Sequence, residues 1–259
     1  MMRLILGGLL LTMVFSAQAK ILYVDVATGS DATSYAANGP STPWASIGRA
    51  VWGSTSMANQ NSSQAAQAGD TVIVRAGVYT TTQMTATRYI PAYNPVNNGS
   101  YGNPITISAE GTVTLRSNTT GGGSPIIGAY NKSYIVWDGF YVDEPNIQTV
   151  SDTGPVVVWS SNNITIQNLT INGKTSGWND NHNAIRIESS RDSIIRNNRM
   201  FGIRNAGRNA NGSAMMLYTS TNITIEHNEI YNSGGGIFVK GANPGPFNIR
   251  YNLIHHIDG

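Results

Sequence analysis

Hydrophobic and polar positions recur with a fixed period in the second half of the chain. A six-residue pattern begins at residues 137, 166, 195, 225 and 249, so its copies are 29, 29, 30 and 24 residues apart. The fourth copy, residues 225–230, reads Ile-Glu-His-Asn-Glu-Ile. A fixed period in the twenties is typical of a solenoid, in which each repeat stacks on the next.

Each period also contains a short run in which every second residue is apolar. Strict alternation bounded by turn residues predicts a β-strand with one face inside, and no helical periodicity of about 10 residues is present here. We therefore predict an all-β parallel β-helix, in which each strand pairs with its own copy one coil away. The inward positions are residues 156 and 158, 185 and 187, 215 and 217, and 237 and 239.

One turn position is predicted to form an amide ladder. Asn198, Asn228 and Asn252 occupy the same place in three successive copies. Stacked asparagine side chains can pass hydrogen bonds along the axis of stacked strands. Phe140 and Leu169 stand at this place in the two earlier copies, so the ladder should begin late.

These residues resemble the repeat of pectate-lyase-like proteins, a family of right-handed parallel β-helices. In that family the Ile-x-Ile-x-x-Asn-x-Ile segment forms the second strand, an asparagine turn and the third strand. The run at residues 236–240 is similar to the first strand, which lines the family's substrate groove. The resemblance covers roughly residues 21–259 and implies a right-handed, single-stranded solenoid. Residues 69–79 are similar to a signature that opens many exported β-helix proteins, including polysaccharide lyases.

The first 19 residues are predicted to be a bacterial-type signal peptide. Arg3 supplies the positive charge, residues 4–15 the apolar segment, and residues 17–19 an Ala-x-Ala cleavage site. The apolar segment is too short for a membrane anchor. We therefore expect a secreted or periplasmic protein whose single β-helix domain spans residues 20–259, with no membrane association after signal removal.

We expect a capping element at each end of the solenoid, because terminal coils would otherwise expose the core. Thr42 before Pro43 predicts a helix start, and Ile47, Ala50 and Val51 share one face of that short helix. We expect the helix to cap the N-terminal end. We also expect the chain to be truncated at Gly259, where another first strand should begin, with self-association of the last coil as the alternative.

The amino-acid composition limits the reactions and partners that the chain can have. The chain has no cysteine, which excludes disulfides and thiolate chemistry. Only 12% of residues are charged and the formal net charge is +2. This is no electrostatic footprint for nucleic acid, and it is compatible with an acidic polysaccharide as partner.

The outward positions of the first strands hold the candidate site residues. Aromatic rings beside charges on a flat ladder suit a sugar, because rings stack on its apolar faces and charges bind its carboxylates or hydroxyls. Ordinary solvated surface residues are the alternative. The predicted catalytic residues are Lys240 and Arg186. The predicted substrate-binding residues are Trp159, Glu188, Tyr218 and Phe238, with His182 and Arg208 from the preceding turns.

Lys240 is the strongest candidate for the catalytic base. Removing the proton next to a uronate carboxylate needs a base, and lysine can serve among cationic or apolar neighbours. The run 238–240 and the turn after it are similar to the lysine-bearing coil of the alginate lyase and chondroitinase B family, which implies that Lys240 is the base. That family has acidic calcium ligands seven and five residues earlier, where this chain has Ser233 and Gly235. The partner arginine expected one coil later lies beyond Gly259. Calcium is thus left open as a cofactor, and no metal ligand is assigned.

Three functions remain in view. The leading hypothesis is a polysaccharide lyase that cleaves a uronate-containing polysaccharide by β-elimination. The alternatives are a non-catalytic glycan-binding or adhesin-type module, and a hydrolase using carboxylates such as Asp138, Asp143 and Glu144. His255 and His256, adjacent in a strand, should point to opposite faces and make a poor metal chelate.

Overall fold

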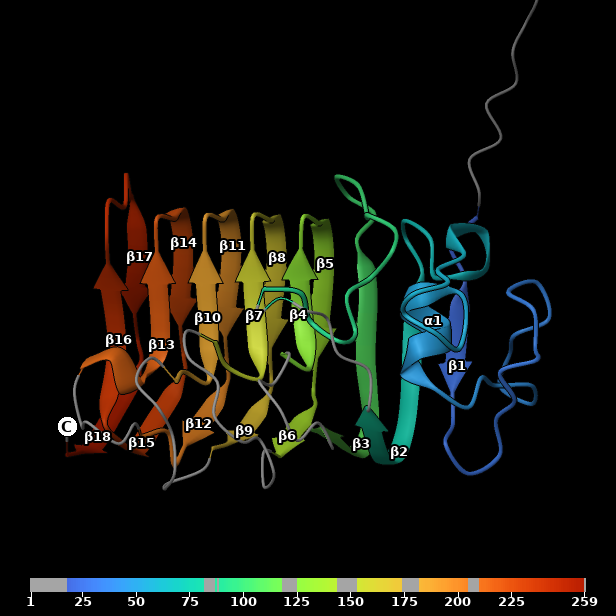
Figure 1. Cartoon of the computed structure of the whole chain (residues 1–259), viewed down its shortest axis with the longest axis horizontal. Coiled ribbons are helices and arrows are strands. Elements are labelled where there is room, and N and C mark those ends of the chain that lie inside the picture. Colours follow the sequence, from blue (N-terminus) through green and yellow to red (C-terminus); the bar gives the residue numbers. More distant parts are fainter. Residues whose placement is uncertain are drawn as a thin grey trace, which may run out of the picture.

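The computed structural model describes residues 18–81, 87, 89–117, 125–143, 153–173, 182–204 and 210–258. In this part the chain forms a stack of coils whose named strands all pair in parallel, along one axis (Figure 1). The described strands form one five-stranded sheet and one thirteen-stranded sheet. The predicted parallel β-helix is confirmed, and its right-handed sense stays a prediction.

The strands fall into an irregular N-terminal part and a regular C-terminal part. The irregular part contains β1 (Ile21–Val24), β2 (Thr71–Thr81) and β3 (Ile105–Ser117). The five-stranded sheet contains β4 (Ile127–Tyr130), β7 (Val156–Trp159), β10 (Ile185–Glu188), β13 (Ser213–Tyr218) and β16 (Gly235–Lys240).

The thirteen-stranded sheet takes up β1, β2 and β3 together with the second and third strands of each regular coil. The second strands are β5 (Ser133–Asp138), β8 (Asn162–Gln167), β11 (Arg191–Arg196), β14 (Thr221–Glu226) and β17 (Phe247–Arg250). The third strands are β6 (Tyr141–Asp143), β9 (Thr170–Asn172), β12 (Arg199–Phe201), β15 (Glu229–Ser233) and β18 (Leu253–Ile257).

The register confirms the repeat read from the sequence. Trp137, Ile166, Ile195, Ile225 and Ile249 are direct partners in successive strands. Inward positions of the five-stranded sheet stack likewise, and Val158, Ile187 and Leu217 are completely buried. Only at the last coil does this column open, where Val239 is 39% exposed.

The asparagine ladder is confirmed, and a backbone N–H of the preceding coil adds one more hydrogen bond to it. Asn198 Nδ2 donates to Asn228 Oδ1 at 2.9 Å, and Asn228 Nδ2 donates to Asn252 Oδ1 at 2.9 Å. The ladder ends on the backbone N–H of Leu169, which donates to Asn198 Oδ1 at 3.0 Å. Because the amides also bond to main-chain carbonyls, the turn can be buried without leaving polar groups unpaired.

A second ladder, made of serines, was not predicted. Ser161, Ser190 and Ser220 are buried at the turn that follows the five-stranded sheet. Each hydroxyl accepts a hydrogen bond from the backbone N–H one coil earlier, at 3.1 to 3.3 Å. Asn243 takes the serine's place in the last coil, where its Oδ1 accepts from Ser220 N at 2.8 Å. Small polar residues thus satisfy the turn backbone along the axis.

The predicted helix exists, but its start was wrong. Helix α1 (Ile47–Trp52) begins after Ser46, whose hydroxyl accepts from Arg49 N. Pro43 is not helical, because Trp44 is held extended against β1: its N–H donates to Tyr23 O at 2.9 Å and its carbonyl accepts from Asp25 N at 2.8 Å. Helix α1 packs against β1 and β2 at the N-terminal side (Figure 1). Its role as a cap stays a prediction.

The predicted signal peptide lies almost entirely outside the described residues. Of the proposed signal peptide, residues 1–17 are not described. In the part of the chain that the structure describes, no helix has the length and apolar character needed to cross a membrane.

A core substitution tests the stacking. Leu217→Ala should lower the free energy of unfolding by about 2–5 kcal/mol, because Leu217 is fully buried in a middle coil. Val239→Ala, in the same column but 39% exposed, should cost less. Urea unfolding of both variants measures the difference, and equal losses would contradict the assigned register.

The asparagine ladder gives a second test. Asn228→Ala should cost about 1–3 kcal/mol, because the N–H of Asn198 and the carbonyl of Ile195 lose their partner in a buried turn. Asn248→Ala is the control, since Asn248 is exposed in β17. Thermal unfolding should separate the two variants. A melting temperature for Asn228→Ala equal to that of the control would refute the ladder's contribution.

Candidate functional site

The outer face of the five-stranded sheet carries the predicted site residues in two columns. We call the first the central column; it consists of Gly128, Val157, Arg186, Met216 and Phe238. The second, the distal column, consists of Tyr130, Trp159, Glu188, Tyr218 and Lys240. In both columns each residue is the direct partner of the next through the parallel register, as the alternation predicted, and β4 adds one further member to each.

The middle of this face is not solvated surface. Val157 and Met216 are each 1% exposed although they point outward, and Arg186 is 7% exposed. Toward the last rung the face opens, and Phe238 is partly exposed while Lys240 is exposed. Among the described outward residues of this face, the charged side chain that is open to solvent therefore lies on the last strand.

Arg186 and Glu188 form a buried ion pair. They are two residues apart in β10, so both project from the same face of the sheet. Arg186 Nη2 lies 2.8 Å and Nε 2.9 Å from Glu188 Oε2, and the two side chains are 9% and 11% exposed. Of the outward residues in the five strands described, Glu188 is the only carboxylate. The pair neutralises its charge within the face.

Two asparagines connect this ion pair to Lys240. Asn183 Oδ1 accepts from Arg186 Nη1 at 3.4 Å, and Asn183 Nδ2 donates to the carbonyl of Asn211 at 3.1 Å. The side chain of Asn211 in turn accepts from Lys240 Nζ at 3.1 Å. The structure thus joins Arg186 and Lys240, two rungs apart, in one polar network.

Asn183 and Asn211 were not predicted as site residues. Each lies two residues before a first strand, in the turn that precedes it, and that position was their only signal. Asn183 is completely buried, and its amide also donates to Ser213 O at 2.8 Å. Such an amide fixes the loop to the next coil and holds the network in place.

Aromatic rings surround the accessible end. The ammonium of Lys240 lies 6.0 Å from the centroid of the Phe238 ring. The Tyr218 ring packs on Gly241, because a Cβ built there would come within 2.8 Å of the ring. Gly241 also has a φ of +85°, which favours glycine. A lysine beside an aromatic ring and open to solvent could bind a sugar carboxylate as the ammonium, or take a proton from a carbon acid as the neutral amine.

The remaining predicted residues lie in different settings. Trp159 is covered by Tyr89 of the segment before β3, with ring centroids 3.8 Å apart. His182 is 1% exposed and forms a parallel backbone bridge with Thr153, so its side chain is buried in the turn before β10 and does not line an open wall. Arg208 lies outside the described residues.

The positions considered for calcium do not fit that ion. Ser233 is completely buried and its hydroxyl donates to Tyr231 O at 3.0 Å, and Gly235 has no side chain. Calcium prefers several carboxylate and carbonyl oxygens. Among the described residues, no group of three or more histidine, aspartate or glutamate side chains could hold a metal ion.

The other carboxylates and the histidine pair lie on the second sheet. Asp138 accepts from Gln167 at 3.0 Å, and Asp143 pairs with Arg116 at 3.1 Å; Glu144 is outside the described residues. The opposite-face prediction for the histidines was wrong. His256 has a φ of +52°, which turns the strand and brings the Nδ1 atoms of His255 and His256 to 2.5 Å.

Comparisons with known proteins bear on the fold. No protein-family model matches the sequence, and no curated protein matches it. A solved rhamnogalacturonan lyase is similar, with 16% identity and a TM-score of 0.58 over 92% of this chain and 69% of that protein. A lacto-N-biosidase from Eubacterium ramulus has 10% identity and a TM-score of 0.44, over 91% of this chain and 56% of that protein.

A pectate lyase is also similar, with 13% identity and a TM-score of 0.34 over 94% of this chain and 79% of that protein. At such low identity a likeness concerns the fold alone, and the argument for it rests on the rhamnogalacturonan lyase. The chain shares a β-helix architecture with that enzyme, and the identity of its site residues has to be argued from its own geometry.

The buried ion pair can be tested against an exposed one. Glu188→Ala should cost about 3–5 kcal/mol of unfolding free energy, because it leaves the Arg186 guanidinium buried and unpaired. Glu229→Ala removes the partner of Arg199 in a pair whose side chains are 36% and 55% exposed, and should cost about 0–1 kcal/mol. Urea unfolding compares the variants, and a loss below 1 kcal/mol for Glu188→Ala would overturn the buried pair.

Proposed function

We propose that the protein is an exported polysaccharide lyase that cleaves an acidic, uronate-containing polysaccharide by β-elimination. The observation that carries the proposal is the placement of Lys240: it is exposed on the outer face, beside Phe238, and tied to Asn211. The β-helix architecture shared with a rhamnogalacturonan lyase supports this class of substrate. Export rests on the signal peptide predicted at residues 1–19.

In the proposed reaction Lys240 Nζ, as a neutral amine, removes the proton on the carbon next to the uronate carboxylate. The electron pair left behind forms a carbon–carbon double bond, and the bond from the neighbouring carbon to the glycosidic oxygen breaks. The leaving oxygen takes a proton from water, and the ammonium of Lys240 gives its proton to the hydroxide that remains, which restores the neutral amine. The products are a shortened chain with a free hydroxyl and a chain that ends in an unsaturated uronate. The Tyr218 and Phe238 rings would hold sugar rings on either side of the reacting unit.

Arg186 has a supporting role in this proposal. It lies two rungs from Lys240 and its guanidinium is engaged with Glu188 and Asn183. Through Asn183 and Asn211 it fixes the acceptor that holds Lys240 Nζ. We therefore assign Lys240 as the catalytic residue and Arg186 as a positioning residue. Trp159, Glu188 and His182 are then structural neighbours of the site, and Arg208 keeps its predicted role in substrate binding.

Non-catalytic glycan binding is the second candidate function. It is favoured by the distal column, where Tyr218 and Lys240 put a ring and a cation on one ladder, and where the one other described charged residue, Glu188, is paired with Arg186. Hydrolysis by a carboxylate pair is less favoured, because Glu188 is neutralised by Arg186. Turnover distinguishes a lyase from a binding module.

The activity test uses ultraviolet absorbance of the unsaturated uronate. Purified protein is incubated with alginate, pectin, rhamnogalacturonan and glycosaminoglycans, and one of these should yield a rise in absorbance. Lys240→Ala should reduce the rate by at least about 100-fold, as expected for loss of a general base. Arg191→Ala is the charge-matched control, because Arg191 is an exposed cation of the other sheet, with a side chain 63% exposed.

The outcomes are separable. Product formation that Lys240→Ala leaves intact would overturn the assignment of the base. Binding without product on every polymer, unaffected by Lys240→Ala, would replace the lyase by the binding module.

A further inference from the structure

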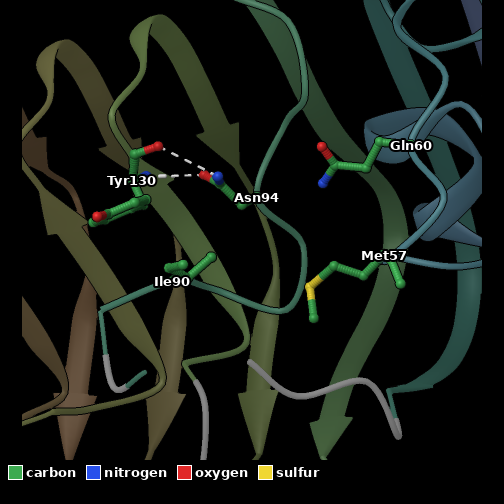
Figure 2. A pocket seen from close by; sticks show the side chains of 6 residues that line it. Met57, Gln60, Ile90, Asn94 and Tyr130 are labelled. Carbon is green, nitrogen blue, oxygen red and sulfur yellow. Dashed lines mark hydrogen bonds between the residues drawn. The ribbon is translucent and has the colours of Figure 1, made fainter. Parts of the chain in front are cut away.

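A pocket of about 510 Å³ lies at the other end of the same outer face, beside β4. Figure 2 shows Met57 and Gln60 on one side of it, facing Ile90, Asn94 and Tyr130 on the other. Ala58 completes the described lining. Tyr130 is the first member of the distal column, so the pocket adjoins the ladder that ends at Lys240.

One wall is built by a segment that extends the five-stranded sheet. Tyr93 forms a parallel bridge with Ile127, and its N–H donates to Ile126 O at 2.9 Å. Asn94 then replaces a backbone partner: its Oδ1 accepts from Tyr130 N at 2.8 Å and its Nδ2 donates to Tyr130 O at 3.3 Å (Figure 2). The wall that carries Tyr130 is therefore held by paired hydrogen bonds.

The opposite wall is the loop that follows α1. It leaves the helix at Gly53, where φ is +71° and a Cβ would lie 1.8 Å from the carbonyl of Asn61. The loop returns at Asn61, whose N–H donates to Trp52 O at 2.7 Å. Trp52 Nε1 also donates to Ala92 O at 3.0 Å, which ties this wall to the other. The loop is thus anchored at both ends, and the space between the walls is preformed.

The lining has the chemistry of a site for an uncharged polar ligand. None of the six described lining residues is charged. Met57 and Ile90 supply apolar surface on opposite walls (Figure 2). Within the described residues the Gln60 amide takes part in no hydrogen bond, and it faces the space between the walls, so it is available to a ligand (Figure 2). A pocket of this size, mostly apolar with a few polar groups, is typical of small-molecule sites.

We propose that this pocket binds one neutral sugar unit of a glycan chain. A sugar ring between the walls would contact Met57 on one side and Ile90 and Tyr130 on the other, and its hydroxyls would bond to the Gln60 amide. A uronate would bring a carboxylate into a pocket whose described lining holds no cation, which carries a desolvation cost. The ligand class rests on the proposed function, but binding in the pocket does not require Lys240.

The position of the pocket gives it a role as an anchor. Tyr130 and Lys240 are separated by four steps of the parallel register, Tyr130–Trp159–Glu188–Tyr218–Lys240. At about 4.8 Å for each step, this is about 19 Å along the axis. A chain bound at both places must be several units long, with a neutral unit at one end and an acidic unit at the other. Attachment at two points raises the affinity for long chains over short ones.

The first experiment measures binding of single sugars by saturation-transfer NMR. The probes are the methyl glycosides of glucose, galactose, mannose and rhamnose, together with the methyl glycosides of glucuronate and galacturonate. At least one neutral glycoside should bind, and more tightly than either uronate. Tyr130→Ala and Gln60→Ala should each weaken it, by about tenfold for loss of the ring. Tyr101→Ala is the matched control, since Tyr101 is 88% exposed and does not line the pocket.

Lys240→Ala separates this proposal from the proposed function. It should leave binding of the neutral glycoside unchanged while it abolishes turnover of the polymer. If no neutral glycoside binds, if a uronate binds more tightly, or if Gln60→Ala and Tyr130→Ala with native melting temperatures bind as the wild type does, the pocket proposal is overturned. The assay for the unsaturated product is measured independently. The lyase proposal can therefore be contradicted while the pocket proposal is supported, and the reverse.

Discussion

The distance between neighbouring parallel strands, about 4.8 Å, is the constraint on which this structure depends. Every residue of a regular coil lies above its counterpart in the coil before, so each position must be compatible with itself repeated along the axis. Inward positions such as Val158, Ile187 and Leu217 meet this demand as an apolar column. Buried turns meet this demand through hydrogen bonds. In the asparagine ladder each side-chain amide both donates and accepts along the axis, and in the serine ladder each hydroxyl accepts from the backbone N–H of the neighbouring coil.

The same constraint concentrates chemistry on the outer face. A charged residue in the middle of the stack has neighbours above and below at fixed distance, and Arg186 is neutralised within its own strand by Glu188. Among the described outward residues of the five-stranded sheet, the cation open to solvent is Lys240. The proposed base is thus accessible, while its hydrogen bond to Asn211 connects it through Asn183 to the buried ion pair.

At the other end the regular repeat gives way to loops, and there a pocket forms. The segment around Asn94 copies the hydrogen bonding of a strand onto β4 without continuing the sheet further, and the loop after α1 stands opposite. One face of the solenoid therefore has an exposed lysine toward one end and, toward the other, a walled pocket whose described lining is uncharged. A polymer with acidic and neutral units is the ligand that such a face would suit.

The sequence by itself determined the parts of the fold that depend on repetition: the strands, their register, the inward columns and the asparagine ladder. It could do so because stacking compares a position only with its own copies, and those are visible at a fixed period. Only the tertiary structure decided what covers the outer face, so the burial of Val157 and Met216 was not foreseen. It also placed Trp44 against β1, which delays the helix start. Asn183 and Asn211 both precede first strands of the repeat, but repetition does not predict that they connect Arg186 to Lys240. The pocket of Met57, Ile90 and Tyr130 joins residues from segments that share no periodicity, and no sequence pattern relates them.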